Sequence, residues 1–149
     1  MSRQLVWRDR WIIESHPEKG PKSAKEALDE ILDQLRAHGW VQHDVFSVHL
    51  AVEEALINAI KHGNNYDATK SVRLLCRLRS NWCQIKIADE GPGFDPATVP
   101  DCTLDENLDT QSGRGLMLMR GFMTTVVYVP PGKLVVMEKV RTPCSQAAA

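Results

Sequence analysis

The feature that most constrains the fold of this 149-residue chain is an alternation of side-chain character from residue 71 to residue 79. Successive side chains of a β-strand point to opposite faces, so alternation predicts a strand with one buried face. Ser80-Asn81 is a turn signal, and residues 82–88 continue as a second strand of a hairpin. The apolar set is Val72, Leu74, Cys76 and Leu78, and the intervening set is Arg73, Leu75, Arg77 and Arg79. We interpret these arginines as the solvent side of the strand rather than as a basic binding patch.

Other segments predict further strands and two shorter helices. Residues 125–129 and 133–140, joined by Pro130-Pro131-Gly132, predict a closing hairpin, and residues 11–14 predict a strand near the start. Ser23 and Glu26 form a capping box before a helical apolar pattern that stops at Gly39, and residues 115–123 predict another helix. Because the strands come in hairpins, we expect an α+β fold: a two-layer α/β sandwich with a mixed, mainly antiparallel sheet and helices on one face.

The segment 44–62 predicts a longer helix with an unusually wide apolar surface. One side carries Val45, Val48, Val52, Ala55, Leu56 and Ala59, and a second side carries Phe46, Leu50 and Ile57. We therefore expect protein to cover most of this helix. A narrow polar stripe remains, formed by Ser47, Glu54, Asn58, Lys61 and His62. The spacing of Glu54, Asn58 and His62 suits either a solvated helix face or the wall of a pocket.

Length and composition predict a single domain over residues 1–141, followed by a frayed tail at 142–149. Eighteen Lys and Arg against 19 Asp and Glu give a net charge of −1, so direct binding of nucleic acid is not expected. Apolar stretches stop short of the roughly 18–20 residues needed to cross a bilayer, so we expect a cytoplasmic protein without membrane contact. The four cysteines form no Cys-x-x-Cys pair, so neither a zinc site nor a disulfide framework is expected.

Two glycine-containing segments add candidate chemistry to the Glu54 and Asn58 stripe. Residues 89–93, Asp-Glu-Gly-Pro-Gly, follow a strand, where glycine lets backbone approach a ligand and Asp89 can accept a hydrogen bond from an amine. Residues 112–116, Ser-Gly-Arg-Gly-Leu, open a helix and present free N–H groups to an anion. Taken alone, the first is also a tight turn and the second a hinge with Ser112 as N-cap. The irregular stretch 91–112 predicts a functional lid or a disordered segment.

Together and in this order, the three segments resemble the Bergerat nucleotide-binding fold of gyrase, the 90-kilodalton heat-shock chaperones, histidine kinases and MutL ATPases, the GHKL or histidine-kinase-like ATPase superfamily. Residues 54–63, 89–95 and 113–120 are most similar to the small anti-sigma-factor serine/threonine kinases of bacterial stress and sporulation switches. The resemblance covers about residues 23–139. It implies ATP and Mg²⁺ as cofactors.

The resemblance also implies roles for individual residues. Asn58 would coordinate Mg²⁺, Asp89 would bind the adenine amino group, and Glu54 would be the catalytic general base. Gly91 and Gly93 would shape the adenine pocket, and His62 with Lys61 would approach the phosphates. The phosphate-binding motif would be Gly113, Arg114, Gly115 and Leu116. The chain departs from the family where Gly132 is followed by Lys133-Leu134 instead of a threonine, and Thr124 or Thr125 is the expected substitute.

The implied function is that of an ATP-dependent protein serine/threonine kinase. It would phosphorylate an anti-sigma-factor antagonist with a STAS-type domain and sequester a sigma factor. One alternative is a non-catalytic nucleotide-binding module for partner switching. Another is a detached histidine-kinase catalytic domain, disfavoured because the histidines before residue 50 lie in or beside the predicted elements. Trp7 and Trp11 on the first strand either supply a homodimer interface or pack against their own sheet.

Overall fold

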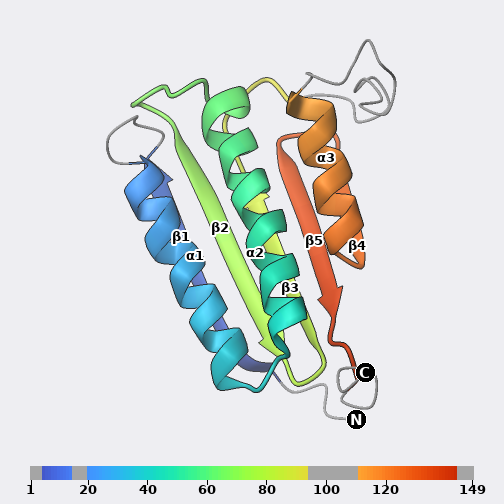
Figure 1. Ribbon diagram of the computed structural model, residues 1–149. Coiled ribbons are helices and arrows are strands. Elements are labelled where there is room, and N and C mark those ends of the chain that lie inside the picture. The colour runs from blue at the N-terminus through green and yellow to red at the C-terminus, as the bar shows by residue number, and fades with distance from the viewer. Residues whose placement is uncertain (1–4, 15–19, 94–110, 144–149) are drawn as a thin grey trace.

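The computed structural model describes residues 5–14, 20–93 and 111–143 (Figure 1). In this part of the chain, three α-helices lie side by side across one face of a five-stranded sheet (Figure 1). The elements in chain order are β1 (Leu5–Glu14), α1 (Gly20–Ala37), α2 (Gln42–Ile57), the π-helical turn η1 (Asn58–Gly63), β2 (Ser71–Arg79), β3 (Trp82–Ala88), α3 (Gln111–Phe122), β4 (Thr125–Val129) and β5 (Leu134–Val140).

The predicted two-layer α+β architecture is confirmed. The strand order is β1-β2-β3-β5-β4, and every pairing among the described strands is antiparallel. Both predicted hairpins form, β2 with β3 and β4 with β5. The first strand is longer than the predicted residues 11–14. β1 begins at Leu5 and pairs with β2 along the whole length of β2. No helix among the described residues has the length and apolarity needed to cross a bilayer.

The core lies between the sheet and the helices, as the alternation in β2 requires. Val72, Leu74 and Leu78 are fully buried, while Arg73 and Arg77 on the other face are exposed. The helices complete the core with apolar stripes that include Ala27, Ile31 and Leu35 of α1 and Val48 and Val52 of α2. Trp7 and Trp11 of β1 face this same layer and pack against the core, as in the second of their two expected arrangements. A homodimer interface on this strand stays a prediction.

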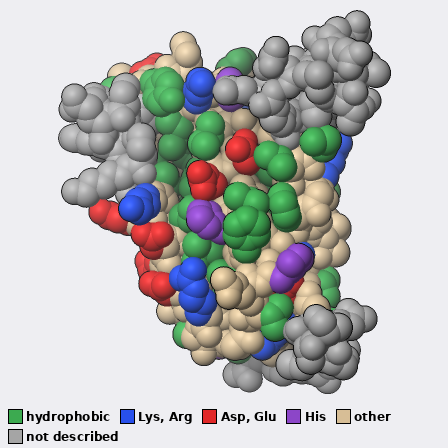
Figure 2. All heavy atoms as spheres, in the orientation of Figure 1, with side chains coloured by type: hydrophobic (Ala, Val, Ile, Leu, Met, Phe, Trp, Pro, Cys, Tyr) green, Lys and Arg blue, Asp and Glu red, His purple; other side chains and the backbone are tan. Residues whose placement is uncertain are grey.

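The expected burial of α2 on most of its circumference is wrong. Phe46 and Ile57 are 53% and 42% exposed, because the sheet, α1 and α3 surround only part of the helix. The Phe46 ring packs against the Phe122 ring in a T-shaped arrangement, with the ring centroids 6.3 Å apart. Hydrophobic side chains consequently lie beside acidic and histidine side chains on this outer face (Figure 2). Ser47, predicted on the polar stripe, is instead buried and donates its hydroxyl proton to the His43 carbonyl at 2.9 Å.

Two helices begin earlier than the sequence pattern indicates. α1 starts at Gly20, so Ser23 lies inside the helix and is not its N-cap. α3 starts at Gln111, so Ser112 is also a helical residue. Pro21 is compatible with a first helical turn, because proline lacks only an N–H that has no helical acceptor there. In α3, packing against α2 outweighs the low helix propensity of glycine.

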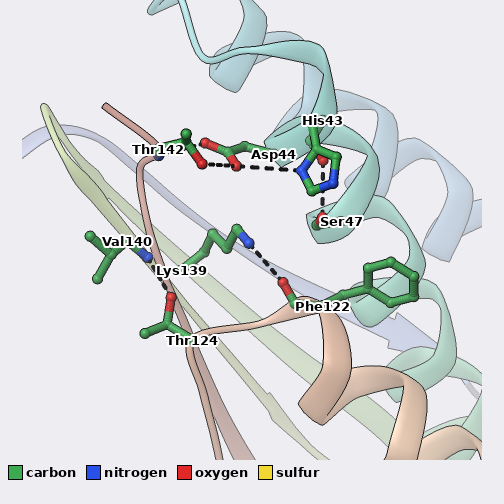
Figure 3. Close-up of polar contacts among 8 residues, drawn as sticks. All are labelled: His43, Asp44, Ser47, Phe122, Thr124, Lys139, Val140 and Thr142. Atoms are coloured by element: carbon green, nitrogen blue, oxygen red, sulfur yellow. Dashed lines mark hydrogen bonds and ion pairs between the residues drawn. The ribbon is translucent and has the colours of Figure 1, made fainter. Parts of the chain in front are cut away.

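Hydrogen bonds fasten the end of β5 to the helices at one end of the sheet (Figure 3). Asp44 is fully buried, and its carboxylate accepts hydrogen bonds from the Thr142 backbone N–H and hydroxyl, each at 2.7 Å. Lys139 donates to the Phe122 carbonyl, and Val140 N–H donates to the Thr124 hydroxyl, both at 2.9 Å. Thr142 is the first residue of the predicted tail, and it is held in place; residues 144–149 lie outside the described residues.

Replacing Asp44 by Ala should lower the free energy of unfolding by about 2–3 kcal/mol, because hydrogen bonds to a buried charged acceptor are lost and the Thr142 N–H is left without a partner. Urea unfolding of the two proteins measures this difference. Asp33→Ala is the matched control, since Asp33 is exposed and pairs only with Arg36, and it should cost at most about 0.5 kcal/mol. Equal losses in both variants would contradict the assignment.

Candidate functional site

The polar stripe of α2 faces the start of α3. Glu54 and Asn58 are half-buried, and Gly115 lies opposite both. A Cβ atom at Gly115 would come within 2.9 Å of Glu54 Oε2 and 3.3 Å of Asn58 Nδ2. The missing side chain therefore lets the α3 backbone approach the two polar groups closely. Of the two arrangements left open for the stripe, this position between helices fits the wall of a site better than a solvated face.

The helix changes its hydrogen bonding at Asn58, one turn after Glu54. From there to Gly63 the chain is π-helical, and Asn64 N–H donates to the Ala59 carbonyl at 2.9 Å. π-Turns inside helices are rare and frequently occur at functional sites. The turn ends with Gly63 against the Asp89 carboxylate, where a Cβ would lie 2.7 Å from Asp89 Oδ1. The polar stripe and the end of β3 are thus brought together by this turn.

Asn64 holds the same junction and was not predicted from the sequence, where it looked like an ordinary loop residue. It is 1% exposed. Its amide donates to the Ser71 carbonyl at 2.9 Å, and its side-chain oxygen accepts the Glu90 N–H at 2.7 Å. Asn64 therefore ties the end of η1 to the start of β2 and to the loop after β3. A single buried asparagine has no periodic signature, so only the Gly63-Asn64 pair hinted at it.

Asp89 lies at the end of β3 in a tightly packed loop. Its Oδ1 accepts the Gly91 N–H at 2.8 Å, and its own N–H donates to the Lys133 carbonyl at 2.9 Å. A Cβ at Gly91 would overlap the Gly63 carbonyl. The glycine predicted to admit a ligand is therefore required by the packing of the protein backbone against itself. Lys133, where the sequence departs from the family pattern, lies directly beside Asp89.

Burial raises the pKa of Asp89 above its ordinary value. The Gly91 N–H and the charges of Lys133 and Lys70 oppose this effect only in part. The folded state therefore disfavours the charged form of a carboxylate that lies at the surface of the candidate site. A carboxylate kept at such a cost is a feature of functional sites more than of structural ones.

Tyr128 of β4 connects the two groups of polar residues. Its hydroxyl is hydrogen-bonded to the Asn58 side chain, and the Asp89 charge acts on it as well. Burial raises the pKa of Tyr128 to about 12, and the hydrogen bond with the Asn58 side chain lowers it in part. Tyr128 was not predicted as a site residue, because the pattern of residues 125–129 indicates only a strand.

The remaining predicted site residues have different outcomes. His62 is exposed on η1, and the Leu116 side chain packs in the core. Gly113 lies in the first turn of α3, where backbone N–H groups have no acceptor within the helix. Gly93 has a positive φ of 80° and packs on the Pro131 carbonyl. The Arg114 side chain and most of the predicted lid, residues 94–110, lie outside the described residues.

The suggestion that Thr124 or Thr125 replaces the missing threonine is wrong. Thr125 pairs with Glu138, and Thr124 accepts the Val140 N–H. Leu134, the first residue of β5, pairs with Ala88 next to Asp89, whereas Thr125 pairs with Glu138 near the other end of β5. Both threonines therefore lie at the end of the hairpin away from Lys133 and Asp89. The antiparallel register therefore places them beyond reach of the Asp89 loop.

The fold and the candidate site agree with the class of protein that the sequence resembles. Helices cover one face of the sheet, one helix carries the Glu–Asn stripe, and another begins with glycines. Residues 18–139 match the model of the histidine kinase-like ATPase domain, and the chain belongs to this family.

Named relatives are protein kinases and anti-sigma factors. The chain is 31% identical over 91 residues to the serine/threonine-protein kinase BtrW of Bordetella bronchiseptica. The aligned region covers 60% of this chain and 64% of BtrW. It is 32% identical over 111 residues to the serine-protein kinase RsbW of Staphylococcus aureus, covering 68% and 69% of the two chains. It is 30% identical over 102 residues to the anti-sigma F factor of Oceanobacillus iheyensis, covering 66% and 62%. The matched region is thus just under two thirds of BtrW, and the resemblance found in the sequence is confirmed.

Replacing Asp89 by Asn should raise the midpoint of thermal unfolding at neutral pH. Asparagine keeps an acceptor for the Gly91 N–H and removes the cost of a partly buried charge. Because the folded-state pKa of Asp89 is raised, wild type loses stability as the pH rises through that pKa, and the advantage of the variant grows over the same interval. Calorimetric scans between acidic and neutral pH measure it.

Asp67→Asn is the control of opposite sign. Hydrogen bonds from Thr69 lower the pKa of Asp67, so its charged form favours folding. This variant should be less stable than wild type at neutral pH, and the difference should vanish in acid. A similar shift in both variants would contradict the account of Asp89.

Proposed function

We propose that the protein is an ATP-binding anti-sigma regulatory factor with serine/threonine-protein kinase activity. It transfers the γ-phosphoryl group of ATP to a hydroxyl of an anti-sigma-factor antagonist with a STAS-type domain, and it sequesters a sigma factor. The carrying observation is the placement of Glu54 and Asn58 one helical turn apart, opposite Gly115. The names of the relatives, serine-protein kinase and anti-sigma F factor, support the same function.

The residues at the site fit ATP and Mg²⁺. Asn58 offers an amide oxygen, and oxygen is the ligand type that Mg²⁺ prefers, while Glu54 one turn earlier offers a carboxylate for a proton. A Cβ at Gly115 would intrude on the space between α3 and these two side chains. Asp89 uses Oδ1 for the Gly91 N–H and has further lone pairs for an amine. The Asp89 carboxylate therefore suits an adenine amino group, and the Asn58 amide oxygen suits a metal bound to phosphates.

Each residue has one task in the proposed mechanism. Bound Mg·ATP supplies the transferable phosphoryl group and neutralises charge during its transfer. Asn58 would hold the metal, with its amide oriented by the Tyr128 hydroxyl. Asp89 would accept the adenine amino proton, beside the loop shaped by Gly91 and Gly93. The first turn of α3, with Gly113, Arg114, Gly115 and the following Leu116, would bind phosphates through N–H groups and the guanidinium. His62 on η1 is a further candidate phosphate contact.

Glu54 would take the proton from the attacking hydroxyl of the antagonist. The hydroxyl oxygen bonds to the γ-phosphorus, the bond to the bridging oxygen breaks, and ADP leaves. The phosphoryl group adds negative charge to the antagonist and weakens its contact with the kinase. The kinase is then free for the sigma factor. A binding-only module would need Asn58 and Asp89 but no carboxylate at position 54, so the presence of Glu54 beside Gly115 favours the catalytic alternative.

Gly115→Ala should abolish nucleotide binding while the protein stays folded. The added methyl group enters the space next to Glu54 and Asn58, and Glu54 can rotate away, so folding tolerates it. Gly121→Ala in the same helix is the matched control, since a methyl group at Gly121 would have no atom of the described residues within 4 Å. It should gain about 0.5–1 kcal/mol of stability from helix propensity. Titration calorimetry with Mg·ATP should detect binding to the control only.

Glu54→Gln should keep ATP affinity and lower phosphotransfer to an antagonist by about 100-fold or more, because a general base is removed. Asn58→Ala should lose the Mg²⁺-dependent part of ATP binding, by about tenfold or ~1.4 kcal/mol. Calorimetry with and without Mg²⁺ and transfer from γ-labelled ATP measure the two effects. Full phosphotransfer by Glu54→Gln would remove the base assignment, and nucleotide binding without any transfer by wild type would favour the binding-only module.

A further inference from the structure

The face of the sheet turned away from the helices carries a group of basic side chains that the nucleotide site does not use. In antiparallel strands, directly paired residues lie on the same face. Arg77 of β2 pairs with Arg8 of β1, and Leu75 pairs with Arg10 of β1 and Lys86 of β3. Arg73, also on β2, completes the group. We call these five cations, Arg8, Arg10, Arg73, Arg77 and Lys86, the basic sheet face.

The basic sheet face surrounds an apolar centre. Leu75 lies between Arg10 and Lys86 across the strands, and between Arg73 and Arg77 along β2. Such neighbours are about 5 Å apart across strands and roughly 7 Å apart along one strand. Ile12, which pairs with Arg73, is 70% exposed on the same face. Apolar and cationic side chains are therefore interleaved over a surface several residues wide.

These cations have no neutralising partners within the described part of the chain. Arg8, Arg10, Arg73 and Arg77 are exposed, and none of the five cations forms an ion pair with a described carboxylate. Glu138 on the neighbouring β5 accepts hydrogen bonds from Trp82 and Gln84 at 3.2 and 2.9 Å. The charge is thus available to a binding partner.

The arrangement is unfavourable for the isolated protein. Arg8 and Arg77 are directly opposite each other, and like charges in that position destabilise a sheet. The whole chain carries a net charge of −1, so the group does not follow from a basic composition. Residues that cost stability without a structural return commonly serve a function.

The alternation in β2 indicated only a solvent side for Arg73 and Arg77, but β1 and β3 add cations beside them. We infer that the basic sheet face binds an acidic surface of a partner protein, with carboxylates pairing to the arginines and apolar side chains contacting Leu75 and Ile12. A second copy of this chain fits poorly, because cations would meet cations. Nucleic acid fits less well than protein, because Leu75 and Ile12 interrupt the charges with aliphatic surface. The helices and the nucleotide site lie on the other face of the sheet, so this inference does not depend on the proposed kinase function (Figure 1).

The probe for a test is a synthetic acidic amphipathic peptide with Glu on its polar side and Leu on its apolar side, titrated against the full chain by fluorescence anisotropy. Wild type should bind it, with an affinity that falls as salt is added. Arg10→Glu/Arg77→Glu should weaken binding by about tenfold or more, since two attractive charges become repulsive. Ile12→Ser should also weaken it. Lys25→Glu/Arg36→Glu on α1, with the same change in net charge, should bind like wild type.

Stability separates a binding role from a structural one. Arg77→Glu turns the like-charged pair with Arg8 into an opposite-charged pair, so its thermal unfolding midpoint should rise while its affinity for the peptide falls. The neutral variant Arg10→Gln/Arg77→Gln should also bind more weakly while remaining folded. Equal weakening by the α1 control variant would overturn the inference. Tighter binding of duplex DNA than of the peptide at the same salt concentration would also overturn it, in favour of a nucleic-acid surface.

Discussion

One-sided burial of the sheet is the constraint on which the rest of this structure depends. The strands present apolar side chains on one face of the sheet, and three helices cover that face. Because α2 lies over the middle of the sheet, with α1 and α3 on its flanks, its polar stripe can only face a neighbouring helix or solvent. The approach of α3 at Gly115 brings its backbone close to Glu54 and Asn58 of that stripe, which makes this the candidate site. Because the helices cover only one face, the other face of the sheet, which carries the basic sheet face, is not covered by any described helix.

The site is held together by backbone contacts that glycine permits and by one buried amide. Gly63 lies against Asp89, and Gly91 lies against Gly63, so the end of η1 and the loop after β3 form one packed unit. Asn64 adds hydrogen bonds to both β2 and that loop. All of these contacts are made between protein atoms. The polar groups are therefore positioned before binding, which lowers the conformational entropy that the protein must lose when a ligand binds.

The sequence predicted those parts of the molecule that repeat with a short period. Alternation in residues 71–88 gave the hairpin and its buried face, and helical spacing identified Glu54 and Asn58 together. Parts that depend on the neighbours of a residue were not predictable. Phe46 is exposed and Ser47 is buried because of what surrounds α2, whereas their residue types indicate the reverse. Asn64 and Tyr128 likewise depend on hydrogen-bond partners far away in the sequence, Glu90 for Asn64 and Asn58 for Tyr128. The π-turn has local hydrogen bonds, but no periodic pattern in the residues marks it.

The β4–β5 hairpin contributes to both ends of the candidate site. Tyr128 on its first strand reaches Asn58, while the carbonyl of Lys133, just before its second strand, accepts the Asp89 N–H. The turn between them closes with a hydrogen bond from Gly132 N–H to the Val129 carbonyl at 2.7 Å. The hairpin therefore contacts both the α2 stripe and the loop after β3. An insertion in its turn would carry the Lys133 carbonyl away from the Asp89 N–H and leave that donor without its acceptor, whereas the pairing of Tyr128 with Val135 would keep Tyr128 where it is. The turn thus fixes one half of the candidate site, and the strand register fixes the other.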